Sequence, residues 1–335
     1  MTRQTAFWRT NWFRIAIGTL ISAFCLLLAL KDVPLGDVAQ ALAHANYGWV
    51  VLALLAMVLQ TWLRAVRWIL LYYPHHHGLR VRAMWGISVI GQMLNIVAPW
   101  RIGELARIYL AGEIEKRSKV QTIATLGVEK IFDTLMLLAI LLTLPLFMTL
   151  PTWLEQPREG LVIVSVAMFA VAIALIFSRD WLIRLVEKIP ILWRGLSLST
   201  HAQRALSGLD VFKRWDVHLE LQALSLVGWS LGVFCNYLTL LALNLQLPFV
   251  SALLLMAVLQ VGVFVPSSPG KVGVFQYLCI LALSLFAVDK SMGFTYGILL
   301  YFVAFGPPVA LGVFFLWWNG VNLRRVAASE TESAS

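Results

Sequence analysis

The stretch QMLNIVAPWRIGELAR, residues 92–107, decides the fold class of this chain. It closes an apolar run, Ala83–Ala98, at Pro99 and continues directly into charged residues. Proline lacks a backbone donor and clashes with the preceding turn, so it interrupts a helix. The run has 16 residues, fewer than the roughly 20 that a helix needs to cross a bilayer. A short apolar helix interrupted by Pro and Gly is typical of re-entrant membrane helices.

A second interruption of the same kind lies half a chain length away. The motif Pro-x-x-x-Gly at residues 99–103 recurs at residues 266–270, an offset of 167. Apolar runs of about the same length, Phe249–Val265 and Val272–Val288, flank the second motif. Short interrupted segments at corresponding positions of two halves predict an internal repeat.

The composition of the rest of the chain agrees with a membrane protein. Of 335 residues, 60% are hydrophobic and 13% are charged, against roughly 45–50% and 25% in soluble domains. This excludes a soluble catalytic domain and predicts an all-α polytopic membrane protein. The apolar runs expected to span the membrane are Ile15–Leu30, Tyr47–Leu63, Val120–Leu150, Leu161–Phe177, Leu219–Leu247 and Ser291–Trp318.

The basic residues predict how the chain is oriented. The net charge is +9, but Lys and Arg occur in short stretches between apolar runs. This pattern favours anionic lipid over nucleic acid as the partner. With the N-terminus inside and each broken segment turning back at mid-membrane, all but six of the 26 basic residues fall inside. The two hairpins then enter from opposite sides, as in an inverted repeat.

This topology predicts one transmembrane domain over residues 1–325 in an inner membrane, with both termini cytoplasmic. We expect a first half over about residues 10–178, an amphipathic cytoplasmic linker over 179–216 and a second half over 217–325. The polar tail, residues 326–335, is expected to be disordered.

Charged residues in the first half are the leading candidates for a site. Arg101, Glu104 and Arg107 are spaced to share a helix face, as are Glu129 and Asp133 on the following span. Charges at membrane depth are costly, so they face a partner or a polar cavity. Two interpretations follow: a substrate or ion pathway, or structural locks in which the carboxylates neutralise arginines.

The second interruption offers an anion site. Ser268 followed by Pro269 predicts an N-cap and the first turn of a half-helix, whose free N–H groups and dipole suit a phosphate. Lys271 adds a full charge, and Ser267 and Gly270 complete the candidate substrate-binding stretch. The residues expected to form the structural breaks are Pro99, Gly103, Pro266, Pro269 and Gly273.

Other polar residues are given structural roles. Arg64 and Arg67 are expected to snorkel to the cytoplasmic interface. His75-His76-His77 lacks further metal ligands, so no metal or other cofactor is expected. Helix-packing hydrogen bonds are expected for Gln92, Asn95, Gln260 and Gln276, and plain packing for Cys25, Cys235 and Cys279.

Several of these motifs together resemble the lysylphosphatidylglycerol synthase transmembrane-region family over about residues 10–320. The residues that carry the resemblance are Arg67-Trp68, Asn95 with Pro99-x-Arg101-x-Gly103-Glu104-x-x-Arg107, Glu129-x-x-x-Asp133 and Pro266-x-x-Pro269-Gly270-x-x-Gly273. The resemblance implies an inverted-repeat bundle with re-entrant helices that moves a lipid between leaflets. Lys271 replaces a glycine of the family pattern and Gln276 replaces an acid. The aminoacyltransferase domain has no counterpart, so lysylphosphatidylglycerol itself need not be the substrate.

The sequence therefore favours a lipid transporter or flippase over an enzyme. An anionic phospholipid or polyprenyl phosphate would bind between Arg101, Lys271 and the half-helix start. Two alternatives stay open: a membrane-embedded enzyme that modifies lipid-linked glycans or phospholipids, and a non-transporting partner subunit of a lipid-modifying synthase.

Overall fold

The chain is helical in the computed structural model, which describes residues 18–98, 102–149, 215–262 and 267–318, with isolated residues between 155 and 170. No strand occurs in these ranges. The helices are Gly18–Leu30, α2 (Leu35–Ala43), α3 (Tyr47–Leu70), α4 (Val81–Val97), α5 (Gly103–Glu115), α6 (Lys119–Thr143), α9 (Trp215–Ala242), α10 (Val250–Val261), α11 (Val274–Ser284) and α12 (Lys290–Trp318), with 3-10 turns η2 (Leu144–Leu146) and η5 (Pro269–Lys271).

Three of the described helices are long and apolar enough to cross a membrane: α3, α9 and α12. A fourth crossing is possible if Gly18–Leu30 and α2, which meet at an 81° bend, form one span. α6 has 25 residues, but three charges interrupt its apolar surface. The helices α4, α10 and the segment Pro269–Ser284 are apolar and shorter, as expected for the broken segments. The expected span Leu161–Phe177 lies largely outside the described residues.

α4 and α5 form a helical hairpin. They pack along each other, and the Arg80 side chain before α4 pairs with Glu115 at the end of α5, Nε to Oε1 2.9 Å. The chain therefore enters and leaves this hairpin at the same end. At its tip, the Gly103 N–H donates to the Asn95 side chain, 2.9 Å, which satisfies one of the free donors at the start of α5.

α10 and α11 form the second hairpin, whose return helix begins later than the sequence predicts. Ser268 and Pro269 start only the short 3-10 turn η5, and the α-helix begins at Val274. The physical reason is local backbone geometry, since Gly270 and Gly273 have φ values of 73° and 88°, which a right-handed helix cannot contain. The expected half-helix start at Ser268 is thus corrected to Val274.

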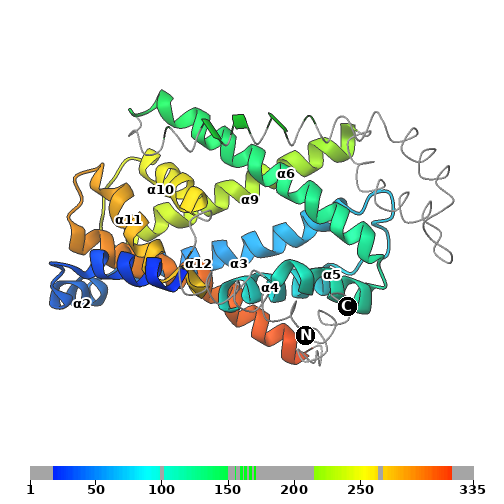
Figure 1. Cartoon of the computed structure of the whole chain (residues 1–335), viewed down its shortest axis with the longest axis horizontal. Coiled ribbons are helices and arrows are strands. Elements are labelled where there is room, and N and C mark those ends of the chain that lie inside the picture. Colours follow the sequence, from blue (N-terminus) through cyan, green and yellow to red (C-terminus); the bar gives the residue numbers. More distant parts are fainter. Residues whose placement is uncertain are drawn as a thin grey trace, which may run out of the picture.

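The two hairpins enter the bundle from opposite ends (Figure 1). α3 joins the ends: the Asn46 N–H at its start donates to the carbonyl of Ala242 at the end of α9, 2.7 Å, shortly before α10 begins at Val250. Its 24 residues then run about 36 Å at 1.5 Å per residue to the first hairpin. The predicted fold class, a helical bundle with opposed broken hairpins, agrees with this arrangement.

The tips of the hairpins meet near the middle of the bundle, where η5 packs against α4. The Tyr301 hydroxyl of α12 donates to the Gly270 carbonyl, 2.8 Å, and the Ser268 N–H donates to the Ser22 hydroxyl, 2.8 Å. Buried apolar residues form two main cores, one around α10 and α11 and one around α4 and α5. Each hairpin thus has its own packed surroundings.

Candidate functional site

Glu129 of α6 is the centre of a network of ion pairs. Its carboxylate accepts from Arg107 of α5 at 2.7 Å and from Arg64 of α3 at 3.1 Å. The guanidinium of Arg67, also from α3, lies 3.7 Å away. Only 1% of the Glu129 side chain is exposed. One buried carboxylate therefore ties three helices together.

Asp133, one turn further along α6, extends the network. It accepts from Arg67 at 2.8 Å and from Arg64 at 3.4 Å. The second nitrogen of the Arg67 guanidinium donates to the Ser225 hydroxyl of α9, 3.1 Å. The i, i+4 spacing that the sequence predicts does place Glu129 and Asp133 on one face, where both meet arginines.

Glu104 and Lys130 form the outer part of the same network. Lys130 pairs with Glu104 at 3.0 Å, and Arg107 lies 3.5 Å from the other Glu104 oxygen. The Arg107 guanidinium also stacks over the Trp68 ring of α3, 4.1 Å from its centroid, a favourable cation–π geometry. We call the seven charged residues the charge cluster: Arg64, Arg67, Glu104, Arg107, Glu129, Lys130 and Asp133.

The charge cluster passes from a buried interior to an exposed rim. Arg67, Arg107 and Glu129 are buried, whereas Arg64 is 36% exposed and Lys130 is 49% exposed. The cluster has four basic and three acidic members, so it carries one positive charge in excess. A charge at the centre of a bilayer costs about 2.5–3.5 kcal/mol on insertion scales, so the ion pairs reduce the cost of burying most of these charges. The one positive charge in excess suits binding of an anion.

The candidates of the second interruption lie in the turn that packs against the end of α4. Ser267, Ser268, Gly270 and Lys271 all belong to this segment, and each is partly buried. The Ser268 N–H is already bonded to Ser22. This segment therefore forms the contact between the hairpin tips, separate in sequence and in element from the charge cluster.

Three other predicted residues, Arg101, Pro99 and Pro266, lie outside the described residues. Of the remaining structural breaks, Gly103 and Gly273 are required for close packing. A Cβ at Gly103 would lie 1.9 Å from the Gly91 carbonyl oxygen, and one at Gly273 would lie 2.3 Å from the Ser22 carbonyl oxygen. Pro269 stands at the first position of η5.

The expectation that Arg67 snorkels to the interface is wrong, whereas for Arg64, whose side chain is 36% exposed, it stays a prediction. Arg67 is 5% exposed, and both arginines reach across to Glu129 and Asp133. Their i, i+3 spacing on α3 places them on one face. Glu129 and Asp133 of α6 needed basic partners, and this could have pointed to the two arginines. A packing bond between helices was expected for Gln276, but its side chain instead caps its own helix by accepting from the Gly273 N–H at 2.7 Å.

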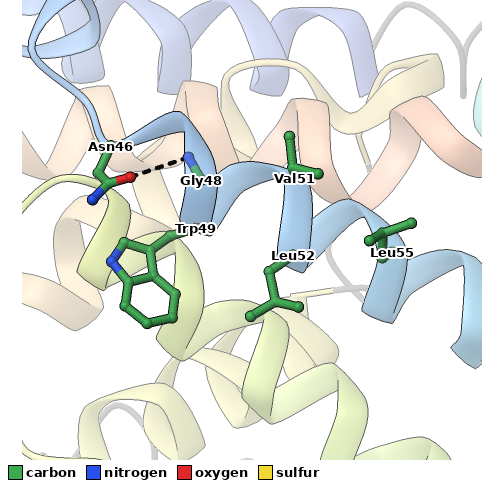
Figure 2. Close-up of a pocket in the computed structure, with 6 residues that line it drawn as sticks. All are labelled: Asn46, Gly48, Trp49, Val51, Leu52 and Leu55. Carbon is green, nitrogen blue, oxygen red and sulfur yellow. Dashed lines mark hydrogen bonds between the residues drawn. The ribbon is translucent and has the colours of Figure 1, made fainter.

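A separate hollow lies at the opposite end of α3. It is lined by Asn46, Gly48, Trp49, Val51, Leu52 and Leu55. Figure 2 shows the Asn46 side chain bonded to the Gly48 N–H, 3.1 Å, with apolar side chains along the helix below it. Val51 and Leu55 are more than half exposed. This surface suits acyl chains and holds no charged group, so it is not the candidate site.

Opposed helical hairpins, apolar spans and a charge cluster shared by α3, α5 and α6 define a multi-pass membrane protein. The chain belongs to the family described as the lysylphosphatidylglycerol synthase TM region, whose sequence model matches residues 15–312. No curated protein and no solved structure matches the chain.

Proposed function

We propose that this protein moves a phospholipid with an anionic headgroup between the leaflets of a cell's inner membrane. The observation that carries this proposal is the charge cluster, which has an excess positive charge and extends from a buried core to an exposed rim. Membership of a lipid-synthase transmembrane family supports lipid as the substrate. Polyprenyl phosphate is the second substrate class that the cluster suits.

The helix arrangement supports passage of a headgroup. α3 and α6 meet through side chains, and the Trp68 indole N–H of α3 donates to the Thr125 hydroxyl of α6 at 3.1 Å. Arg64 and Arg67 join them through Glu129 and Asp133. A phosphate that enters from the rim can replace a carboxylate as the partner of an arginine, because guanidinium binds both bidentately. Exchange of partners lets the headgroup occupy the cluster without leaving a buried charge unpaired.

A lipid-transfer assay tests the proposal. The purified chain is reconstituted in phosphatidylcholine vesicles that contain acyl-labelled phosphatidylglycerol, phosphatidylethanolamine or a polyprenyl phosphate. We expect transfer of phosphatidylglycerol or polyprenyl phosphate at least tenfold faster than in protein-free vesicles. Arg64→Gln should lower this rate about tenfold, because Arg64 lies at the exposed rim and contacts both Glu129 and Asp133.

Lys31→Gln is the matched control, since Lys31 is exposed and lies outside the cluster; its rate should equal that of the wild type. Arg101→Ala and Lys271→Ala test the second predicted site in the same assay. Transfer of none of the three lipids, or equal transfer by Arg64→Gln and wild type, would overturn the proposal.

A further inference from the structure

α4 has two neighbours beside the charge cluster, and its faces can be assigned to them. α4 packs against both α5 and α3. Gly91 faces α5, because a Cβ there would meet the Arg107 side chain at 2.6 Å. Trp85 faces α3, where its indole N–H donates to the Thr61 hydroxyl at 3.0 Å.

Ser88 and Gln92 lie on the α4 face between these two directions, since successive residues of an α-helix are about 100° apart. This face is directed into the wedge between α3 and α5, which do not pack closely against each other over their described lengths. The Arg107 guanidinium crosses the same wedge, because it extends from α5 to the Trp68 ring of α3. We call Ser88, Gln92, Glu104 and Arg107 the wedge residues.

Each wedge residue has a buried polar atom without a hydrogen-bond partner in the described part of the chain. The atoms are Ser88 Oγ, Gln92 Nε2, Glu104 Oε2 and Arg107 Nε. Ser88 is 2% exposed and Arg107 is 4% exposed. Nearly all buried polar groups in proteins have a partner. The Glu104 oxygen has an ion-pair partner in Arg107 at 3.5 Å, so the other three atoms, from two neighbouring helices, indicate that a group from outside the chain completes them.

We propose that the wedge binds a phosphodiester headgroup that also carries a hydrogen-bond donor. Gln92 Nε2 and Arg107 Nε are donors, which suit phosphate oxygens. Glu104 Oε2 lies 3.5 Å from Arg107 but makes no hydrogen bond, so a lone pair remains for a headgroup hydroxyl or ammonium. The Ser88 hydroxyl can donate or accept. This assignment rests on the proposed function and narrows it, because it disfavours choline, whose nitrogen has no hydrogen to donate.

Binding of soluble short-chain lipids tests the wedge without requiring transport. Dihexanoyl phosphatidylglycerol, phosphatidylethanolamine and phosphatidylcholine are titrated calorimetrically into the purified full chain in detergent. We expect phosphatidylglycerol, whose headgroup is anionic and carries hydroxyls, to bind at least tenfold more tightly than phosphatidylcholine. Binding of phosphatidylethanolamine alone would assign the donor as ammonium and would contradict the anionic headgroup of the proposed function. Glu104→Gln should reduce the preference over phosphatidylcholine about tenfold.

Ser88→Ala and Gln92→Leu should each weaken binding of the preferred lipid about five- to tenfold. Their unfolding temperatures without lipid should be unchanged or higher, because an apolar replacement removes a buried group that has no partner. Loss of binding without loss of stability separates a ligand contact from a structural role.

Ser251→Ala and Gln60→Leu are the matched controls. These side chains donate to the carbonyls of Pro248 at 2.8 Å and Gly228 at 2.9 Å. We expect both variants to lower the unfolding temperature and leave lipid binding unchanged.

Three outcomes would each overturn the proposal that the wedge binds a headgroup. These are wild-type affinity in Ser88→Ala and Gln92→Leu, equal affinity for phosphatidylcholine, and binding of none of the lipids. The lipid-transfer assay tests the proposed function separately from the binding assay. Weakened binding in these variants together with no lipid transfer would leave the wedge in place and reject translocation, and transfer with unaltered binding would do the reverse.

Discussion

At the scale of single residues, Glu129 decides whether the cluster holds together. Its carboxylate lies within 4 Å of Arg64, Arg67 and Arg107, and the favourable contacts offset the cost of removing four charges from water. Removing one partner of a buried ion pair is more damaging than replacing the pair, because a charge is left without compensation.

Glu129→Gln should therefore lower the free energy of unfolding by about 3 kcal/mol. The amide still accepts a hydrogen bond, but all three arginines lose the negative charge that they share. Denaturant unfolding in detergent micelles measures the effect. Glu113→Gln, at an exposed position of α5, should stay within about 0.5 kcal/mol of wild type. An equally small effect of Glu129→Gln would mean that the arginines do not depend on it.

At the scale of elements, each hairpin is closed by a side-chain amide and by glycines. Asn95 accepts the first N–H of α5, and Gln276 accepts the N–H that precedes α11. Gly103 lets α5 approach the α4 backbone, and Gly273 lets the second break approach Gly18–Leu30. At both tips, a side-chain amide accepts a free backbone N–H and a glycine allows close backbone contact, as irregular backbone in an apolar medium requires.

Gly103→Ala should destabilise the protein by about 2 kcal/mol, because a Cβ 1.9 Å from the Gly91 carbonyl oxygen forces the helices of the hairpin apart. Gly112→Ala on the same helix is the control. Its nearest neighbour would be 3.6 Å away, so the higher helix propensity of alanine should leave stability unchanged or slightly raised. Thermal unfolding of both variants checks this, and equal unfolding temperatures would contradict the packing at the tip.

At the scale of the whole molecule, the opposed hairpins give the bundle two non-equivalent ends. The first hairpin contributes Glu104 and Arg107 to the charge cluster, and the second brings η5 against α4. In the second break, η5 packs against α4 and its Gly270 carbonyl accepts from the Tyr301 hydroxyl, as expected for irregular backbone that is tolerated at membrane depth.

Cysteine labelling tests this arrangement. In a chain whose native cysteines are replaced, Arg82→Cys and Glu113→Cys at the ends of the first hairpin should react with an impermeant maleimide from one side of the membrane. Gln246→Cys and Ser284→Cys at the ends of the second should react only from the opposite side. All four positions are exposed. Labelling of the two ends of one hairpin from different sides would show that it crosses the membrane and would refute the re-entrant fold.

The sequence by itself determined the all-helical membrane class, the two interruptions and the shared face of Glu129 and Asp133. These follow from local properties: apolar length, proline and glycine chemistry, and the 3.6-residue period. The start of α11 was misjudged because Ser268 and Pro269 fit a cap pattern, while the φ values of Gly270 and Gly273 depend on packing against Gly18–Leu30 and α12.

Only the tertiary structure decided the partners of the charges. Arg64 and Arg67 are 65 and 66 residues from the carboxylates that they bind, and nothing local distinguishes a buried arginine from one that snorkels. The same holds for Ser88 and Gln92, whose significance comes from the α4 face that they share between α3 and α5. Sequence fixes which face a residue occupies on its own helix, but the meeting of two faces is set by how the helices pack, because that depends on every side chain between them.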